Sequence, residues 1–183
     1  MIRIIAGAWR SRRLESPPGL ATRPTASRAR ETLFSMLASR LGSFEGLHVL
    51  DLFAGSGALG LEALSRGAAH ATFVEQDPAA ARACAANIAR LGAAATLLRQ
   101  DATRLPPTPR PFDLLLLDPP YGQDLASAAL SSARRGGWIA PHALIACETG
   151  RGEPLAPPGF APLVTRPVGK AMLHLLAPLP ATP

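Results

Sequence analysis

Residues 48–60 join a short apolar run to a turn rich in glycine. The run His48–Leu52 has the length and composition of a buried strand, and it leads directly into the pattern Gly55-x-Gly57-x-x-Gly60. Glycines in such a turn let the backbone approach a ligand closely and enter the next helix tightly. The segment therefore predicts a strand–turn–helix unit that binds a nucleoside-containing ligand. A turn with a purely structural role is the alternative.

Strand and helix patterns alternate along the rest of the chain. Strands are predicted at 70–75, 95–99 and 112–117, within 138–148, and at 160–166 and 170–177, with helices at 57–66, 78–91 and 124–135. This alternation implies an α/β, Rossmann-like fold with a parallel sheet covered on both faces. Ligands bind such sheets at the carboxyl ends of the strands, near the point where the strand order reverses.

The first 24 residues predict a basic β-hairpin or arm ahead of the main domain. Residues 2–14 read as two strands around a turn at Gly7 and Ala8, followed by a loop over 15–24. Thr25 is the predicted N-cap of a helix that Gly42 ends. The main domain is predicted to span 25–177, and the tail 178–183 is predicted to be disordered.

Positive charge is concentrated near the N-terminus. The net charge of the chain is +6, and residues 1–40, with eight arginines and two acidic residues, hold all of it. Such clustering indicates contact with a polyanion. A GC-rich genome would explain the preference for arginine over lysine, but not the clustering. The residues expected to contact RNA are Arg10, Arg12, Arg13, Arg23, Arg28 and Arg30.

Several other classes of protein are disfavoured. The longest apolar run, 114–117, is far shorter than a membrane span, and the N-terminus has no signal-peptide pattern, so a cytoplasmic protein is expected. Cys84 and Cys147 lie far apart without a CxxC spacing, and the four histidines are scattered. No metal site is expected.

Three acidic residues at successive strand ends favour S-adenosylmethionine as the ligand. Glu75 follows Gly55 by 20 residues and suits the ribose hydroxyls of either NAD or S-adenosylmethionine. Asp51 is placed to face an ammonium or sulfonium group and would repel a pyrophosphate, and Asp101 could accept a hydrogen bond from adenine. The alternatives are that Asp51 holds loop amides and that Asp101 caps a turn. The expected cofactor contacts are Asp51, Phe53, Ala54, Gly55, Gly57, Glu75, Gln76, Asp101 and Ala102.

The tetrapeptide Asp118-Pro119-Pro120-Tyr121 directly follows a predicted strand. An exocyclic amino nitrogen is a poor nucleophile because its lone pair is delocalised into the base. The Asp118 carboxylate and the Pro119 carbonyl could accept its two hydrogens, the prolines stiffen the loop, and Tyr121 offers a face on which a base stacks. All four residues are therefore expected to be catalytic. A proline-rich turn that merely ends a strand is the alternative.

With these motifs in place, the chain resembles the bacterial 16S rRNA (guanine(966)-N(2))-methyltransferase family. The resemblance covers about residues 2–148 and includes the patterns Gly7–Leu14, Arg23–Phe34 and Asp51–Arg66. It implies a seven-stranded class I methyltransferase fold with an N-terminal hairpin, and a transfer of methyl from S-adenosylmethionine to N2 of one guanine, leaving S-adenosylhomocysteine. It further implies that the substrate is the small ribosomal subunit or an assembly intermediate. Nothing is carried over to residues 149–183.

The leading hypothesis is therefore a monomeric rRNA guanine-N2 methyltransferase. Methylation of DNA adenine N6 or of protein glutamine is a second reading, because the same tetrapeptide suits planar amino groups in general. A nicotinamide-dependent oxidoreductase and a non-catalytic RNA-binding module are more remote alternatives.

Overall fold

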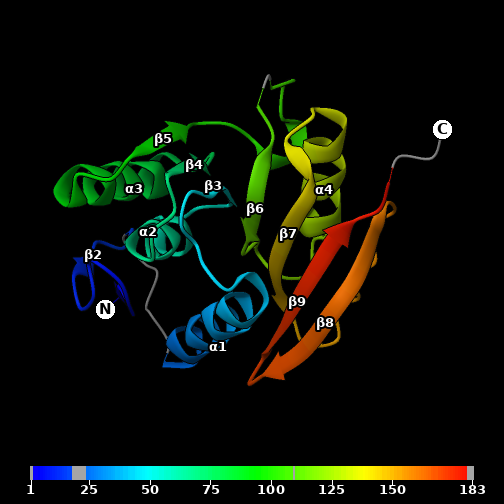
Figure 1. Cartoon of the computed structure of the whole chain (residues 1–183), viewed down its shortest axis with the longest axis horizontal. Helices are drawn as coiled ribbons and strands as arrows, with labels where there is room; N and C mark the ends of the chain where they lie inside the picture. The colour runs from blue at the N-terminus through cyan, green and yellow to red at the C-terminus, as the bar shows by residue number, and fades with distance from the viewer. Residues whose placement is uncertain (1, 18–23, 109, 181–183) are drawn as a thin grey trace.

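The computed structural model describes residues 2–17, 24–108 and 110–180. A seven-stranded sheet in the order β5-β4-β3-β6-β7-β9-β8 forms its centre (Figure 1). Five of these strands are parallel: β3 (His48–Leu52), β4 (His70–Val74), β5 (Ala95–Leu98), β6 (Phe112–Leu117) and β7 (Ile139–Gly150). The predicted seven-stranded, Rossmann-like α/β fold is confirmed.

The sheet is mixed, which corrects the expectation of a purely parallel one. β8 (Phe160–Val168) and β9 (Ala171–Pro178) form an antiparallel hairpin, and β9 pairs antiparallel with β7. Antiparallel strands can be joined by a short turn, so β9 follows β8 directly, whereas parallel neighbours need a crossover connection.

Helices cover both faces of the sheet. α1 (Pro24–Leu41), α2 (Ala58–Ser65) and α3 (Pro78–Leu91) are followed by the short 3-10 helix η1 (Ala102–Arg104) and by α4 (Leu125–Arg135). The leucines of β6 show the two faces: Leu114 and Leu116 pack into one buried cluster, whereas Leu115 and Leu117 pack into the other. Burial on both faces is the expected environment of a central parallel strand, and each fully buried leucine contributes about 1.5–3 kcal/mol.

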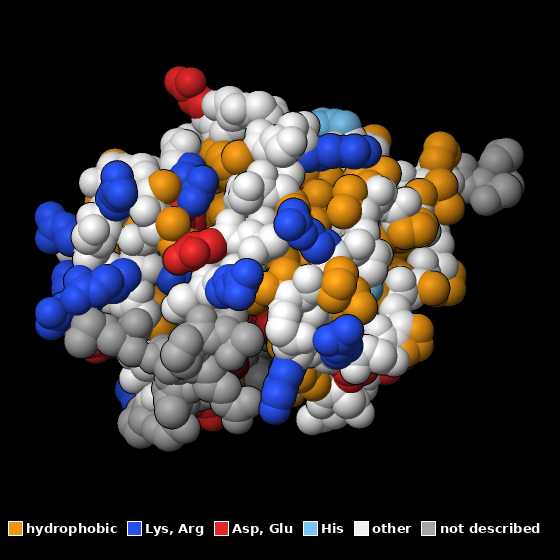
Figure 2. Space-filling view, turned by 90° about the horizontal axis from the view of Figure 1, so that it is seen from below, with side chains coloured by type: hydrophobic (Ala, Val, Ile, Leu, Met, Phe, Trp, Pro, Cys, Tyr) orange, Lys and Arg blue, Asp and Glu red, His pale blue; other side chains and the backbone are white. Residues whose placement is uncertain are grey.

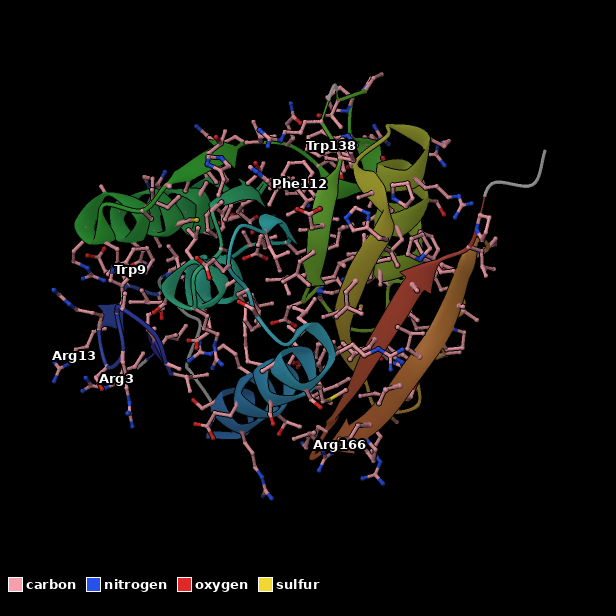
Figure 3. The ribbon with its side chains drawn as sticks, viewed as in Figure 1. Arg3, Trp9, Arg13, Phe112, Trp138 and Arg166 are labelled. Atoms are coloured by element: carbon pink, nitrogen blue, oxygen red, sulfur yellow. The ribbon has the colours of Figure 1, made fainter. Side chains whose placement is uncertain are left out.

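The predicted N-terminal hairpin is present, but its strands are short. β1 (Ile2–Arg3) pairs antiparallel with β2 (Arg13–Leu14). Buried Glu62 of α2 holds the hairpin, because its carboxylate accepts hydrogen bonds from the amides of Ile5 (2.7 Å) and Ala6 (3.1 Å). In Figure 3, Arg3 and Arg13 extend away from the helices, whereas Trp9 lies on the side of the hairpin nearer to α3.

Two predicted boundaries are wrong by a few residues. α1 already includes Pro24, so Thr25 lies inside the helix and is not its N-cap. A proline at the first helical position is favourable because its missing N–H would have no partner there. β9 extends to Pro178, and the amide of Leu179 donates to the carbonyl of Gly159 (2.8 Å), so the chain is ordered beyond the predicted start of the tail. The last part of that tail, 181–183, lies outside the described residues.

None of the helices in the described ranges combines the length and apolar character of a membrane span.

Candidate active site

A cleft of about 1710 Å³ opens at the carboxyl ends of the parallel strands. Leu52 of β3 pairs with Val74 and with Leu117, and Leu117 pairs with Cys147. The next residue on each of these four strands lines the cleft, and in sheet order they are Glu75, Phe53, Asp118 and Glu148. The reversal of strand order falls between β3 and β6, so the cleft occupies the position where α/β sheets bind ligands.

Most of the residues predicted to contact a cofactor line this cleft. Asp51, Gly57 and Asp101 do not. The four residues of the predicted catalytic tetrapeptide all line it as well. The members of the predicted cofactor set that line the cleft are Phe53, Ala54, Gly55, Glu75, Gln76 and Ala102.

Glu75 shapes the glycine-rich loop. Its Oε2 accepts a hydrogen bond from the amide of Gly55 (2.8 Å), and its Oε1 accepts one from the amide of Asp77 (2.8 Å). A carboxylate has about four acceptor positions, so both oxygens can still accept hydrogen bonds from ligand hydroxyls.

Asp51 lies behind the loop rather than in the cleft. It is 1% exposed, and its Oδ2 accepts a hydrogen bond from the amide of Gly60 (2.8 Å). Its Oδ1 has no partner among the described residues. Burial, with smaller contributions from the charges of Asp118 and Glu75, raises the pKa of the Asp51 carboxyl to about 8. The alternative in which Asp51 holds a loop amide is thus observed, and one acceptor atom stays unpaired beside the cleft.

Asp101 caps η1. Its Oδ1 accepts hydrogen bonds from the amide (2.8 Å) and the hydroxyl (2.7 Å) of Thr103, and these bonds lower the pKa of Asp101. The preceding residue, Gln100, lines the cleft instead, and its buried Oε1 has no partner among the described residues. The sequence reasoning overlooked Gln100, although its place just after a strand could have indicated it.

Two glutamates accept hydrogen bonds from the predicted catalytic tetrapeptide and from the residue that follows it. The hydroxyl of Tyr121 donates to Oε1 of Glu148 (2.5 Å), and the amide of Gly122 donates to Glu153. Both glutamates line the cleft, and the sequence reasoning missed them. Glu148 directly follows the apolar run 143–147, so it shows the same strand-end signal that drew attention to Asp118.

Asp118 is exposed to the cleft but surrounded by protein elsewhere. Desolvation by these surroundings, together with repulsion from Glu148, raises the pKa of Asp118 to about 7. Desolvation also raises the pKa of Glu148, although its hydrogen bond from Tyr121 opposes that change. A carboxylate with a pKa near neutrality can both accept and release a proton under ordinary conditions.

Of the described arginines predicted to contact RNA, one lines the cleft. Arg10, Arg12, Arg13 and Arg28 are exposed, whereas Arg30 is partly buried, lines the cleft and donates to the carbonyl of Arg3 (2.6 Å). Arg23 lies outside the described residues. Figure 2 looks onto the molecule from below and shows Lys and Arg side chains across this face, several of them at the end where the hairpin lies. Two further lining residues that the sequence reasoning missed are Arg151, in the turn just after β7, and Lys170, in the turn between β8 and β9.

No group of three or more His, Cys, Asp or Glu residues suited to a metal ion occurs in the described part of the chain. Cys84 and Cys147 are buried free thiols.

Comparison with known proteins identifies the family of this chain. The family model described as Conserved hypothetical protein 95 matches residues 2–177. The chain belongs to this family. The match extends through β8 and β9, which is further than the resemblance over residues 2–148 suggested.

Named relatives and solved structures agree with this assignment. Ribosomal RNA small subunit methyltransferase D of Haemophilus influenzae is 40% identical over 163 residues, which cover 86% of this chain and 83% of that protein. The solved structure of Escherichia coli yhhF has a TM-score of 0.82 and 37% identity, and the match covers 97% of this chain and 98% of that one.

A more distant structure supports the fold alone. The Thermus thermophilus 16S rRNA N2 G1207 methyltransferase, solved with AdoMet and guanosine, has a TM-score of 0.63 and 23% identity, with 89% of this chain and 45% of that chain covered. The fold of this family member is that of class I methyltransferases.

Proposed function

We propose that this chain transfers a methyl group from S-adenosylmethionine to the exocyclic N2 amino group of a guanine in 16S rRNA. The observation that carries the proposal is the continuity of the cleft, which runs from the loop at Phe53–Gly55 and Glu75 to the tetrapeptide starting at Asp118. A donor and a flat base can thus lie side by side in one space. The names of the relatives that share the fold support ribosomal RNA as the substrate.

The residues on the donor side fit S-adenosylmethionine. Glu75 has acceptor capacity left for ribose hydroxyls. Oε1 of Gln100, in the cleft, and Oδ1 of Asp51, behind the loop, are buried acceptors without partners among the described residues. These unpaired atoms favour a ligand that carries N–H donors and positive charge. When bound, S-adenosylmethionine supplies a methyl group on a positively charged sulfur, and that carbon–sulfur bond breaks as the bond to N2 forms.

The tetrapeptide supplies the groups that activate the amino nitrogen. The Asp118 carboxylate and the Pro119 carbonyl each accept one of the two N2 hydrogens, so the nitrogen can become pyramidal and its lone pair can point at the methyl carbon. Asp118 takes up the proton that N2 loses and releases it to solvent, consistent with its pKa of about 7. Tyr121 stacks on the base, and much of the rate enhancement, roughly 7–11 kcal/mol, comes from holding the reactants in line.

The basic N-terminal segment is proposed to hold the RNA. Arg10, Arg12 and Arg13 are exposed on the hairpin, while Arg30 reaches the cleft itself. We propose the small subunit or an assembly intermediate as the substrate, with residues 1–24 acting as the arm and 25–177 as the catalytic domain of a monomer in the cytoplasm.

The test is nucleoside mass spectrometry after incubation with radiolabelled S-adenosylmethionine and either unmodified small subunits or DNA. N2-methylguanosine in 16S rRNA is expected from the wild-type chain. Asp118→Ala should bind the donor in calorimetry but transfer no methyl. Methyladenine in DNA, or full transfer by Asp118→Ala, would contradict the proposal.

A further inference from the structure

We propose that Glu148 is the specificity-determining residue of the cleft, and that its carboxylate accepts a hydrogen bond from N1–H of the target guanine. This inference rests on the proposed function, since it names the group that makes the site choose guanine. The tetrapeptide and the glycine-rich loop at Phe53–Gly55 are proposed to hold the amino group and the methyl donor, and Glu148 of β7 is proposed to recognise the rest of the base edge.

The position of Glu148 follows from the sheet. Leu117 and Cys147 are paired residues of the parallel strands β6 and β7, so Asp118, just after β6, lies beside Glu148, which is still within β7, and both residues line the cleft. In the proposed orientation the amino group of the base lies at Asp118 and its N1–H faces Glu148, so that each carboxylate meets a group that donates a hydrogen bond.

The carboxylate has a free oxygen and a fixed orientation. Oε1 of Glu148 accepts the hydroxyl of Tyr121 (2.5 Å), whereas Oε2 has no hydrogen-bond partner among the described residues. Tyr121 is thus connected both to the proposed stacking of the base and to the carboxylate that meets its edge. A carboxylate held on one side offers a directed acceptor on the other.

The chemistry of the base edges makes this acceptor selective. Guanine carries N1–H beside its C2 amino group, so both neighbouring groups donate hydrogen bonds. Adenine and cytosine instead carry a ring nitrogen with a lone pair beside their amino groups. A carboxylate facing that lone pair would repel it and lose its own hydrogen bond, and a site built to pair a donor rejects an analogue that lacks it strongly. The arrangement of Asp118 and Glu148 is thus complementary to guanine and not to adenine or cytosine.

Such a contact would also assist the transfer. A carboxylate that draws on the N1 hydrogen increases the electron density of the adjacent C2–N2 unit, so the lone pair of N2 becomes more available. No proton has to leave N1 for this effect, and the proton balance of the reaction stays at Asp118.

The test uses 2-aminopurine, which keeps the amino group at C2 but has a lone pair at N1. Small subunits are reconstituted with RNA that carries either guanine or 2-aminopurine at the nucleotide that the wild-type chain methylates, and single-turnover rates are compared. The wild type should prefer guanine by about 10⁴-fold. In Glu148→Gln the amide can donate to the N1 lone pair, so the preference should fall by about tenfold or more, with donor affinity unchanged.

Glu153→Gln is the matched control, because Glu153 holds the same loop through the amides of Gly122 and Gly150. It should change both rates by the same factor and leave the preference intact. Equal loss of both rates in Glu148→Gln would show that Glu148 only supports Tyr121 and would overturn the inference. Equal rates on both bases in the wild type would overturn it even if Glu148→Gln failed to fold. If the wild type methylates no guanine at all, the proposed function fails first.

Discussion

Two carboxyl groups at the strand ends, one facing the cleft and one buried, have raised pKa values with different consequences. Asp118 faces the cleft, where a pKa of about 7 places its ionisation in the range in which the reaction would run. Asp51 lies behind the loop, where burial raises its pKa to about 8 and leaves one oxygen unpaired. The first shift is typical of an acid–base group in a cleft, whereas the second lowers folding stability at neutral pH.

Methyl transfer should increase with pH through the pKa of Asp118. Only the ionised carboxylate accepts the N2 hydrogen, so the single-turnover rate should rise with pH to a plateau, with a midpoint that we expect near pH 7. One pH unit below this midpoint, the rate should be about tenfold lower than on the plateau. Rapid-quench measurements of labelled methyl in RNA would give the profile. Binding of S-adenosylhomocysteine, followed by calorimetry over the same range, separates catalysis from donor affinity. A rate that does not change between about pH 6 and about pH 8 would exclude Asp118 as the acceptor.

Asp51→Asn should stabilise the protein increasingly as pH rises. The pKa of Asp51 is raised from 3.8 to about 8 in the folded state, so its contribution to the free energy of unfolding is fully present below about pH 4 and is lost as pH rises through about 8. The Tm of the variant relative to the wild type should therefore increase by roughly 2–4 °C or more between about pH 5 and about pH 8.5.

Asp101→Asn provides the opposite control. Hydrogen bonds from Thr103 lower the pKa of Asp101, so this carboxylate stabilises the folded state more at higher pH. The Asp101→Asn substitution should therefore lower Tm more at high pH than at low pH. If both variants showed the same pH trend in Tm, burial of Asp51 would not explain its behaviour.

At the scale of elements, the N-terminal hairpin depends on α2 and α3 for its position. Its two strands contribute only two residues each, so pairing alone cannot keep it folded. Glu62 binds the amides of Ile5 and Ala6, and Asn87 of α3 accepts from the amide of Glu15 (2.8 Å) and donates to its carbonyl (3.0 Å). The hairpin is thus attached to α2, which follows the glycine-rich loop, and to α3, which follows Glu75.

Gly7→Ala should detach the hairpin. Gly7 has φ +81°, and a Cβ there would lie 1.7 Å from the carbonyl oxygen of Ser65, so backbone must move. We expect a loss of about 2–4 kcal/mol in the free energy of unfolding, or trypsin cleavage at Arg10–Arg13 under conditions in which the wild type is intact. Gly42→Ala tests conformational strain alone, because Gly42 has φ +72° but nothing within 4 Å of its Cβ position. If both variants lost the same free energy of unfolding and were cleaved by trypsin equally fast, the close contact between Gly7 and α2 would be unimportant.

On the scale of the whole molecule, the cleft is bounded by both ends of the chain. Arg30 reaches it from α1, and Arg151 and Lys170 reach it from turns that follow β7 and β8. α1 lies between the hairpin and the β8–β9 hairpin in Figure 1. Positive charge in the cleft therefore comes from segments that are remote in sequence.

Replacing Arg10 and Arg12 by alanine together should weaken RNA binding and flatten its salt dependence. If each arginine neutralises one phosphate, the slope of log K against log salt should fall by about 1.4–1.8. Filter binding of the small-subunit RNA over a range of salt concentrations would measure it. Arg110→Ala with Arg135→Ala is the matched control. These exposed residues precede β6 and β7, so they lie at the amino ends of the parallel strands, whereas the cleft lies at the carboxyl ends. An equal change in slope for both pairs would argue against an RNA-binding arm.

The sequence alone determined the local units and their order. The apolar run at β3, the glycine turn and the position of Asp118 after β6 are short-range patterns, so strand–helix alternation and a glycine-rich loop at the cleft could be predicted from them. The tertiary structure decided which residues meet. Glu148 lies 30 residues after Asp118, Glu62 holds amides more than 50 residues away, and β9 joins β7 in the antiparallel sense. These contacts depend on strand register and packing between remote segments, and no local pattern encodes either.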